Sequence, residues 1–107
     1  MWEISALQKR VLERLAQEGL RISVLPPYEN ALCVCQGSCA CLVGPAEAGG
    51  LCLLSAPSFL VGGHLSAKLA RGGKEWFVWK EQEIEATPER RAELARFQQS
   101  IEKLMEL

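Results

Sequence analysis

The chain has 107 residues, of which 49% are hydrophobic and 23% are charged, as in an ordinary globular protein. Thirteen acidic and twelve basic residues give a net charge of −1, so no strong positive field draws nucleic acid or anionic membranes to the surface. No apolar run approaches the ~18 residues of a membrane span, and charges interrupt the first ten residues, unlike in a signal peptide. We therefore expect a cytoplasmic protein with reduced cysteines, without nucleic acid or membrane as a partner.

Residues that commonly carry catalysis are scarce. All thirteen acidic residues are Glu, and His64 is the only histidine. The Asp that most often orients a catalytic histidine is therefore missing. We expect His64 to be a loop or helix-terminal residue, and we expect no enzymatic activity.

The first predicted helix covers residues 4–15. Ser5 and Gln8 fit a capping box at its start, and Gly19 fits a left-handed cap after its end. Apolar residues recur at spacings of three and four, which places them on one helical stripe: Ile4, Leu7, Val11 and Leu15. This helix should pack its stripe against the core.

Three stretches of the next forty residues predict strands. Residues 21–25 are rich in β-branched side chains and are followed by two prolines at 26–27, which should end the strand in a turn. Two apolar runs within residues 31–43 flank the segment Gln36-Gly37-Ser38, which is typical of a hairpin. Residues 51–54 form a continuous apolar run with the length of a buried strand.

The predicted hairpin carries four cysteines in a C-x-C-x₃-C-x-C pattern: Cys33, Cys35, Cys39 and Cys41. A three-residue connection would pair Cys35 with Cys39 and Cys33 with Cys41, and all four sulfurs would share one face. A two-residue connection would slip the register, and the four sulfurs would no longer face one another.

Even the favourable register leaves same-strand neighbours about 6.7 Å apart, whereas tetrahedral zinc needs sulfurs roughly 3.8 Å apart. Free cysteines are also among the residues most often buried as small apolar side chains. We therefore expect packing cysteines and no cofactor. Zinc binding or thiol redox chemistry at the four cysteines is the alternative.

Residues 64–71 suit either a helix or a strand. Leu65 and Leu69 fit one helical face, but Leu65, Ala67 and Leu69 also alternate as in a strand. The high helix propensity of Ala, Leu and Lys favours a short helix. The other interpretation is a hairpin closed by the glycine pair at 72–73.

Residues 75–85 predict one long strand whose aromatic start lies in the core and whose Glu-rich end leaves it. Because side chains alternate, Trp76 and Trp79 must lie on opposite faces. Trp76 shares its face with Val78, whereas Trp79 shares its face with glutamates. We therefore expect Trp76 in the core and Trp79 at a rim or an interface.

The last predicted helix begins at Thr87-Pro88-Glu89, where Thr87 supplies a cap and proline is tolerated at the first helical position. Its apolar residues are spaced by three, four and three: Leu94, Phe97, Ile101 and Leu104. Such a seam suits docking on a sheet or on a second copy of the same helix.

Together these elements predict a single α+β domain over residues 1–107. We expect an antiparallel sheet of about four or five strands between an N-terminal and a C-terminal helix, with a possible short helix before the last strand. The expected function is a non-enzymatic protein-interaction or adaptor module that forms a homodimer, with another protein as a further candidate partner. The candidate interface residues are Trp79, Leu94, Phe97, Ile101 and Leu104.

Overall fold

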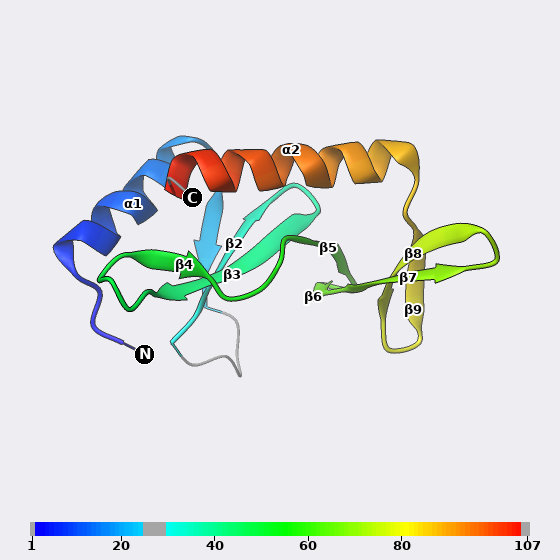
Figure 1. Ribbon diagram of the computed structural model, residues 1–107, viewed down its shortest axis with the longest axis horizontal. Helices are drawn as coiled ribbons and strands as arrows, with labels where there is room; N and C mark the ends of the chain where they lie inside the picture. The colour runs from blue at the N-terminus through cyan, green and yellow to red at the C-terminus, as the bar shows by residue number, and fades with distance from the viewer. Residues whose placement is uncertain (1, 25–29, 106–107) are drawn as a thin grey trace.

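Two helices and two antiparallel sheets make up the described part of the chain, which covers residues 2–24 and 30–105 of a computed structural model. Helix α1 spans Ala6–Gln17 near the N-terminus, and α2 spans Pro88–Met105. Figure 1 shows α2 lying along the molecule, with the strands on one side of it. The α+β prediction, with helices near both ends of the chain, is confirmed.

The larger sheet has six strands in the order β1-β2-β3-β5-β6, with β4 also paired to β3. Its strands are β1 (Arg21–Ser23), β2 (Leu32–Gln36), β3 (Cys39–Pro45), β4 (Leu51–Leu53), β5 (Ser58–Val61) and β6 (His64–Leu65). The central strand is β3, because one edge pairs with β2 while the other pairs with β5 near its start and β4 near its end. Strands β1 to β4 match the predicted stretches, whereas β5 was not predicted. The predicted turn at 26–27 lies outside the described residues.

The smaller sheet has three strands in the order β7-β8-β9. They are β7 (Ala67–Arg71), β8 (Lys74–Trp79) and β9 (Gln82–Glu85). Figure 1 shows this sheet at one end of the molecule, below and beyond the start of α2. The sheet therefore contributes to the elongated shape of the molecule, which measures 47 × 27 × 22 Å along its principal axes.

The short helix predicted over residues 64–71 is wrong. This stretch forms β6 and β7, and β7 pairs with β8 through a turn at Gly72 and Gly73. Both glycines have positive φ angles, of 63° and 76°, which is the backbone of the two-residue turns that match the twist of a hairpin. The turn and the strand pairing therefore outweigh the helix propensity of Ala, Leu and Lys.

The single strand predicted over residues 75–85 is also wrong, because the chain reverses at Lys80 and Glu81 and forms the β8–β9 hairpin. Lys80 has a φ of 54°, in a region that glycine and asparagine usually occupy. The sequence carries no turn residue at this position. The hairpin could therefore not be recognised from turn chemistry.

Both helices have the predicted caps. At α1 the backbone N–H of Gln8 donates to the Ser5 hydroxyl at 3.1 Å. In return the Ser5 N–H donates to the Gln8 side-chain oxygen at 2.9 Å, which completes the capping box. At α2 the Arg90 N–H donates to the Thr87 hydroxyl at 3.2 Å, and Pro88 is the first helical residue.

One buried cluster receives side chains from both helices and both sheets. Its residues with an exposed fraction of 2% or less are Leu15, Val34, Cys39, Cys41, Val43, Phe77, Phe97 and Ile101. Phe59 of the larger sheet stacks on Phe77 of the smaller sheet, with ring centroids 5.0 Å apart and planes inclined by 9°. This aromatic pair joins the two sheets. Neither helix of the described residues is long and apolar enough to cross a membrane.

The prediction that Trp76 lies in the core is wrong. Phe77 is 2% exposed, whereas Trp76 and Trp79 are both half-buried. Since side chains alternate along β8, the face that carries Phe77 meets the core, and Trp76 lies on the opposite face. Trp79 is the indole that packs against the core cluster.

Candidate interaction surface

The cysteine hairpin adopts the two-residue connection. Gly37 and Ser38 form the turn, so Gln36 pairs with Cys39 and Val34 pairs with Cys41. Gly37 has a φ of 59°, which suits the first position of a tight hairpin turn.

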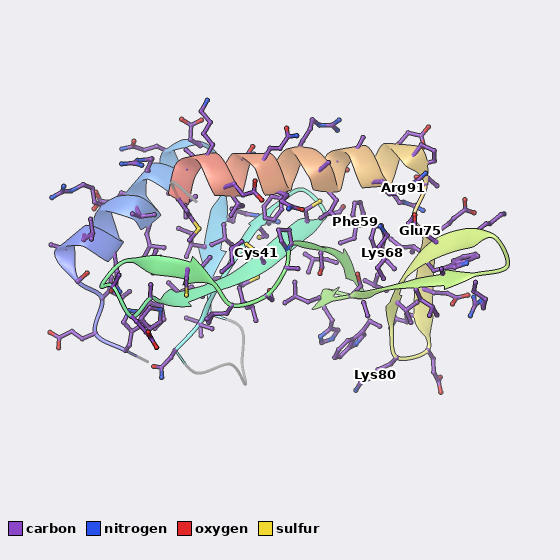
Figure 2. The ribbon with its side chains drawn as sticks, viewed as in Figure 1. Cys41, Phe59, Lys68, Glu75, Lys80 and Arg91 are labelled. Atoms are coloured by element: carbon purple, nitrogen blue, oxygen red, sulfur yellow. The ribbon has the colours of Figure 1, made fainter. Side chains whose placement is uncertain are left out.

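This register divides the four cysteines between the two faces of the sheet. Cys39 and Cys41 belong to the main core cluster on the α2 side, where Figure 2 shows Cys41. Cys33 and Cys35 belong to the small cluster on the reverse face, together with Ala40. Within the described residues, no group of three or more potential metal-ligating side chains is present.

Two of these thiols have strongly raised pKa values. Burial, followed by the charge of Glu93 and a hydrogen bond from the thiol to that carboxylate at 3.7 Å, raises the pKa of Cys39 to about 12. Burial, followed by the nearby Cys33 and Cys35, raises the pKa of Cys41 to about 12. Both thiols are therefore protonated at neutral pH and are poor nucleophiles.

These raised pKa values predict that the protein loses stability in alkaline solution. In the unfolded chain the two thiols ionise near their ordinary pKa of 9.0, whereas in the folded protein they stay protonated to about pH 12. Their contribution is therefore complete below pH 9 and declines between pH 9 and 12, by up to about 1.4 kcal/mol per pH unit for each thiol. Urea titrations across this range measure the slope.

The matched control is the double variant Cys39→Val and Cys41→Val. It keeps apolar side chains of similar size but has no thiol to ionise at either position. We expect its stability to fall less steeply above pH 9 than that of the wild-type protein. Equal slopes of stability against pH in the two proteins would contradict the assignment of the alkaline loss to Cys39 and Cys41.

The predicted seam of α2 faces the core of its own chain. Phe97 and Ile101 are 2% and 0% exposed, which leaves them no surface to offer a partner. Leu94 and Leu104 are half-buried and pack against the same cluster. Docking on the sheet, one of the two arrangements considered for this seam, is the one that the fold contains.

Trp79, the remaining predicted interface residue, lies beside His64. The two rings stack with centroids 4.5 Å apart and planes inclined by 17°. The Lys80 ammonium lies 5.4 Å from the centroid of the same indole. Because His64 and the core cover much of Trp79, this side chain is only partly available to a partner.

The smaller sheet presents an apolar surface on the side opposite to Phe77. The register pairs Ala67 with Val78 and Leu69 with Trp76, so these four side chains lie on one face, which we call the outer face. Leu69 is 44% exposed, and Trp76 and Val78 are half-buried. The outer face is thus a small apolar patch that the described core does not cover.

Charged side chains of both signs border the outer face. The Arg71 guanidinium lies 5.3 Å from the Trp76 ring centroid and forms an ion pair with Glu83 at 2.6 Å. Lys74 and Glu85 are 3.6 Å apart. These ion pairs join each basic residue to a glutamate of β9, so the border has no excess of either sign.

A second set of ion pairs connects the inner face of the smaller sheet to α2. Glu75 contacts the Lys68 ammonium at 2.9 Å and the Arg91 guanidinium at 3.3 Å. The hydrogen bond from Lys68 is the largest of the effects that lower the pKa of the Glu75 carboxyl. Figure 2 shows the three side chains together below the start of α2. They support the position of the smaller sheet beneath the helix.

The helix expected over residues 64–71 excluded this surface from the prediction. Two signals could have found it. Leu65, Ala67 and Leu69 alternate, and two glycines at 72–73 separate them from the aromatic strand.

Comparisons with protein-family models, with curated protein sequences and with solved structures find no match to this chain.

Proposed function

We propose that this protein is a non-enzymatic protein-interaction module that forms a homodimer in the cytoplasm and uses the β7-β8-β9 sheet as its contact surface. The observation that supports the proposal is the uncovered outer face of this sheet. Leu69 and Trp76 lie on it, while the apolar residues of α2 pack against the core of the same chain.

The residues on this surface suit protein contacts. Tryptophan and arginine are enriched among the residues that dominate binding energy, and here Trp76 and Arg71 lie against each other. An apolar centre with a mixed-charge border is also the usual layout of a protein interface. The balanced border offers little attraction to polyanions such as nucleic acid.

We favour this proposal over the thiolate alternative because the hairpin register places two cysteines on each face of the sheet. The raised pKa values of Cys39 and Cys41 also oppose thiolate chemistry at these two positions. The five cysteines are free, which suits a reducing cytoplasm.

Site-directed photo-cross-linking tests the proposal. A benzophenone side chain in place of Leu69 on the outer face is expected to form a covalent adduct with a protein when cells producing the variant are irradiated. The matched control carries the same group in place of Gln99, an exposed residue of α2. Gel shift and mass spectrometry identify what each variant captures.

An adduct between two copies of the chain that forms at residue 69 and not at residue 99 would support the proposal. An adduct with a different protein alone would support the contact surface but contradict the homodimer. Equal capture at both positions, or none at residue 69, would contradict it. Circular dichroism of both variants verifies that each is folded.

A further inference from the structure

β7 is the longest strand in the described residues that has only one neighbour. It has five residues and pairs only with β8, whereas β1, β4, β6 and β9 also have one neighbour but are two to four residues long. All five residues of β7 are exposed. An open edge of this length carries unpaired N–H and C=O groups that can bind another strand.

The turn identifies which backbone groups point away from β8. Arg71 and Lys74 flank the two-residue turn, so they form a hydrogen-bonded pair, and such pairs alternate along an antiparallel ladder. Leu69 and Ala67 are therefore also hydrogen-bonded to β8. Lys68 and Ala70 direct their N–H and C=O groups outward from the open edge.

The two cations of β7 do not block this edge. Lysine on an edge strand commonly prevents pairing between sheets. Here the Lys68 ammonium is held by Glu75 of β8 on the inner face, and the Arg71 guanidinium is held by Glu83 of β9 on the outer face. Both long side chains thus fold back over their own sheet.

We propose that two copies of the protein pair antiparallel through β7, with Leu69 on the two-fold axis, and so join their smaller sheets into one six-stranded sheet. This inference rests on the proposed function and names the partner as a second copy of the chain. In this register Lys68 pairs with Ala70 of the partner subunit, and Ala70 pairs with Lys68 of the partner subunit. The outward groups of these two residues then form four hydrogen bonds across the axis.

The sequence of β7 suits this self-pairing. Read in opposite directions, Ala-Lys-Leu-Ala-Arg places each cation opposite an alanine and places leucine opposite leucine. The leucines form the closely spaced, non-hydrogen-bonded kind of pair, in which side chains make their closest contact. A register with Lys68 on the axis would instead oppose two ammonium groups. The charges of the strand therefore favour the arrangement centred on Leu69 over the one centred on Lys68.

Sedimentation equilibrium and amide hydrogen exchange test the arrangement on the purified full chain. We expect a concentration-dependent dimer in which the Lys68 and Ala70 amides become slower to exchange as the protein concentration rises. The Leu69 and Arg71 amides, which bond to β8, should be protected at every concentration. A dimer in which the Lys68 and Ala70 amides stay unprotected would overturn the register.

The variant Ala70→Pro removes one outward N–H from each copy without removing a bond to β8. The loss of two hydrogen bonds per dimer is expected to weaken dimerisation by about 30-fold. The matched control Ala70→Val keeps the N–H and should dimerise as the wild type does. If circular dichroism shows that Ala70→Pro is unfolded, Leu69→Lys replaces it, because two ammonium groups on the axis should also abolish the dimer.

The outcomes separate this inference from the proposed function. A monomer at high micromolar concentration that still captures a different protein at residue 69 would overturn the β7 dimer and the homodimer of the proposed function, and would leave only the contact surface supported. A monomer with no capture at residue 69 would overturn both. A dimer that Ala70→Pro and Leu69→Lys leave intact would show that the copies associate elsewhere, and would overturn the inference.

Discussion

Replacing Phe77 with Ala is expected to lower the free energy of unfolding by about 3–5 kcal/mol, the usual cost of truncating a buried phenylalanine. Phe77 is 2% exposed and stacks on Phe59, so the substitution removes core volume and the aromatic contact between the two sheets. Chemical denaturation monitored by circular dichroism measures the loss. If the smaller sheet has already detached in the variant, less surface remains to be exposed on unfolding. The free energy of unfolding should then depend less steeply on denaturant concentration.

The matched control is Trp76→Ala, on the adjacent residue of the same strand. Trp76 lies on the outer face under Arg71, so we expect a smaller loss of about 1–2 kcal/mol. If the tryptophan variant were the less stable of the two, the assignment of the faces of β8 would be wrong.

Replacing Phe97 with Ala is expected to cost a similar 3–5 kcal/mol. Phe97 projects from α2 into the core cluster and is 2% exposed. The loss should appear at every protein concentration, because the contacts that disappear lie within one chain. The neighbouring variant Arg96→Ala, at an exposed position of the same helix, should be nearly neutral.

Measurements at two protein concentrations distinguish a core role of Phe97 from a role in an interface between copies. If this ring were part of an interface between copies, Phe97→Ala would dissociate the dimer while leaving the stability of the monomer almost unchanged. Sedimentation equilibrium combined with denaturation at two concentrations distinguishes the two results.

The helices could be predicted because each end carries its own local signal. Ser5 with Gln8, and Thr87 with the backbone N–H of Arg90, define helix starts through side-chain hydrogen bonds within four residues of sequence. Such a cap depends only on residues that are close in the sequence, so it can be recognised without the structure. Strands β1 to β4 could also be predicted from local sequence, because short apolar runs bounded by proline or glycine are typical of buried strands.

The register of the cysteine hairpin could not be predicted, because Gln36-Gly37-Ser38 permits a turn of two or of three residues. A difference of one residue exchanges the faces of every side chain on one strand. The shorter turn sends Cys39 toward Glu93 of α2, a contact between residues 54 positions apart in the chain. Such a contact depends on the complete fold rather than on the local sequence.

The candidate surface was not predicted from the sequence, for two physical reasons. In residues 67–71, helix propensity favoured the wrong element, while the pairing partner that makes a strand stable lies beyond a turn. At Lys80 the backbone takes a left-handed conformation without a residue that favours it, so β8 and β9 resembled one strand. The predicted interface residues of α2 were apolar and correctly placed on one stripe, but sequence periodicity does not identify which surface a stripe meets.

The glycine turn between β7 and β8 has a consequence for how this protein can change. Figure 1 shows that the turn projects from the end of the molecule, away from both helices. Arg71 and Lys74 form the hydrogen-bonded pair that closes the turn at Gly72 and Gly73. Insertion of one residue in each strand beside the turn would place a non-hydrogen-bonded pair there, whereas insertion of two in each strand would restore a hydrogen-bonded pair. The hairpin can therefore grow or shrink in steps of two residues per strand without altering the core. The extent of the exposed sheet, and with it the strength of any contact made there, can vary independently of the stability of the domain.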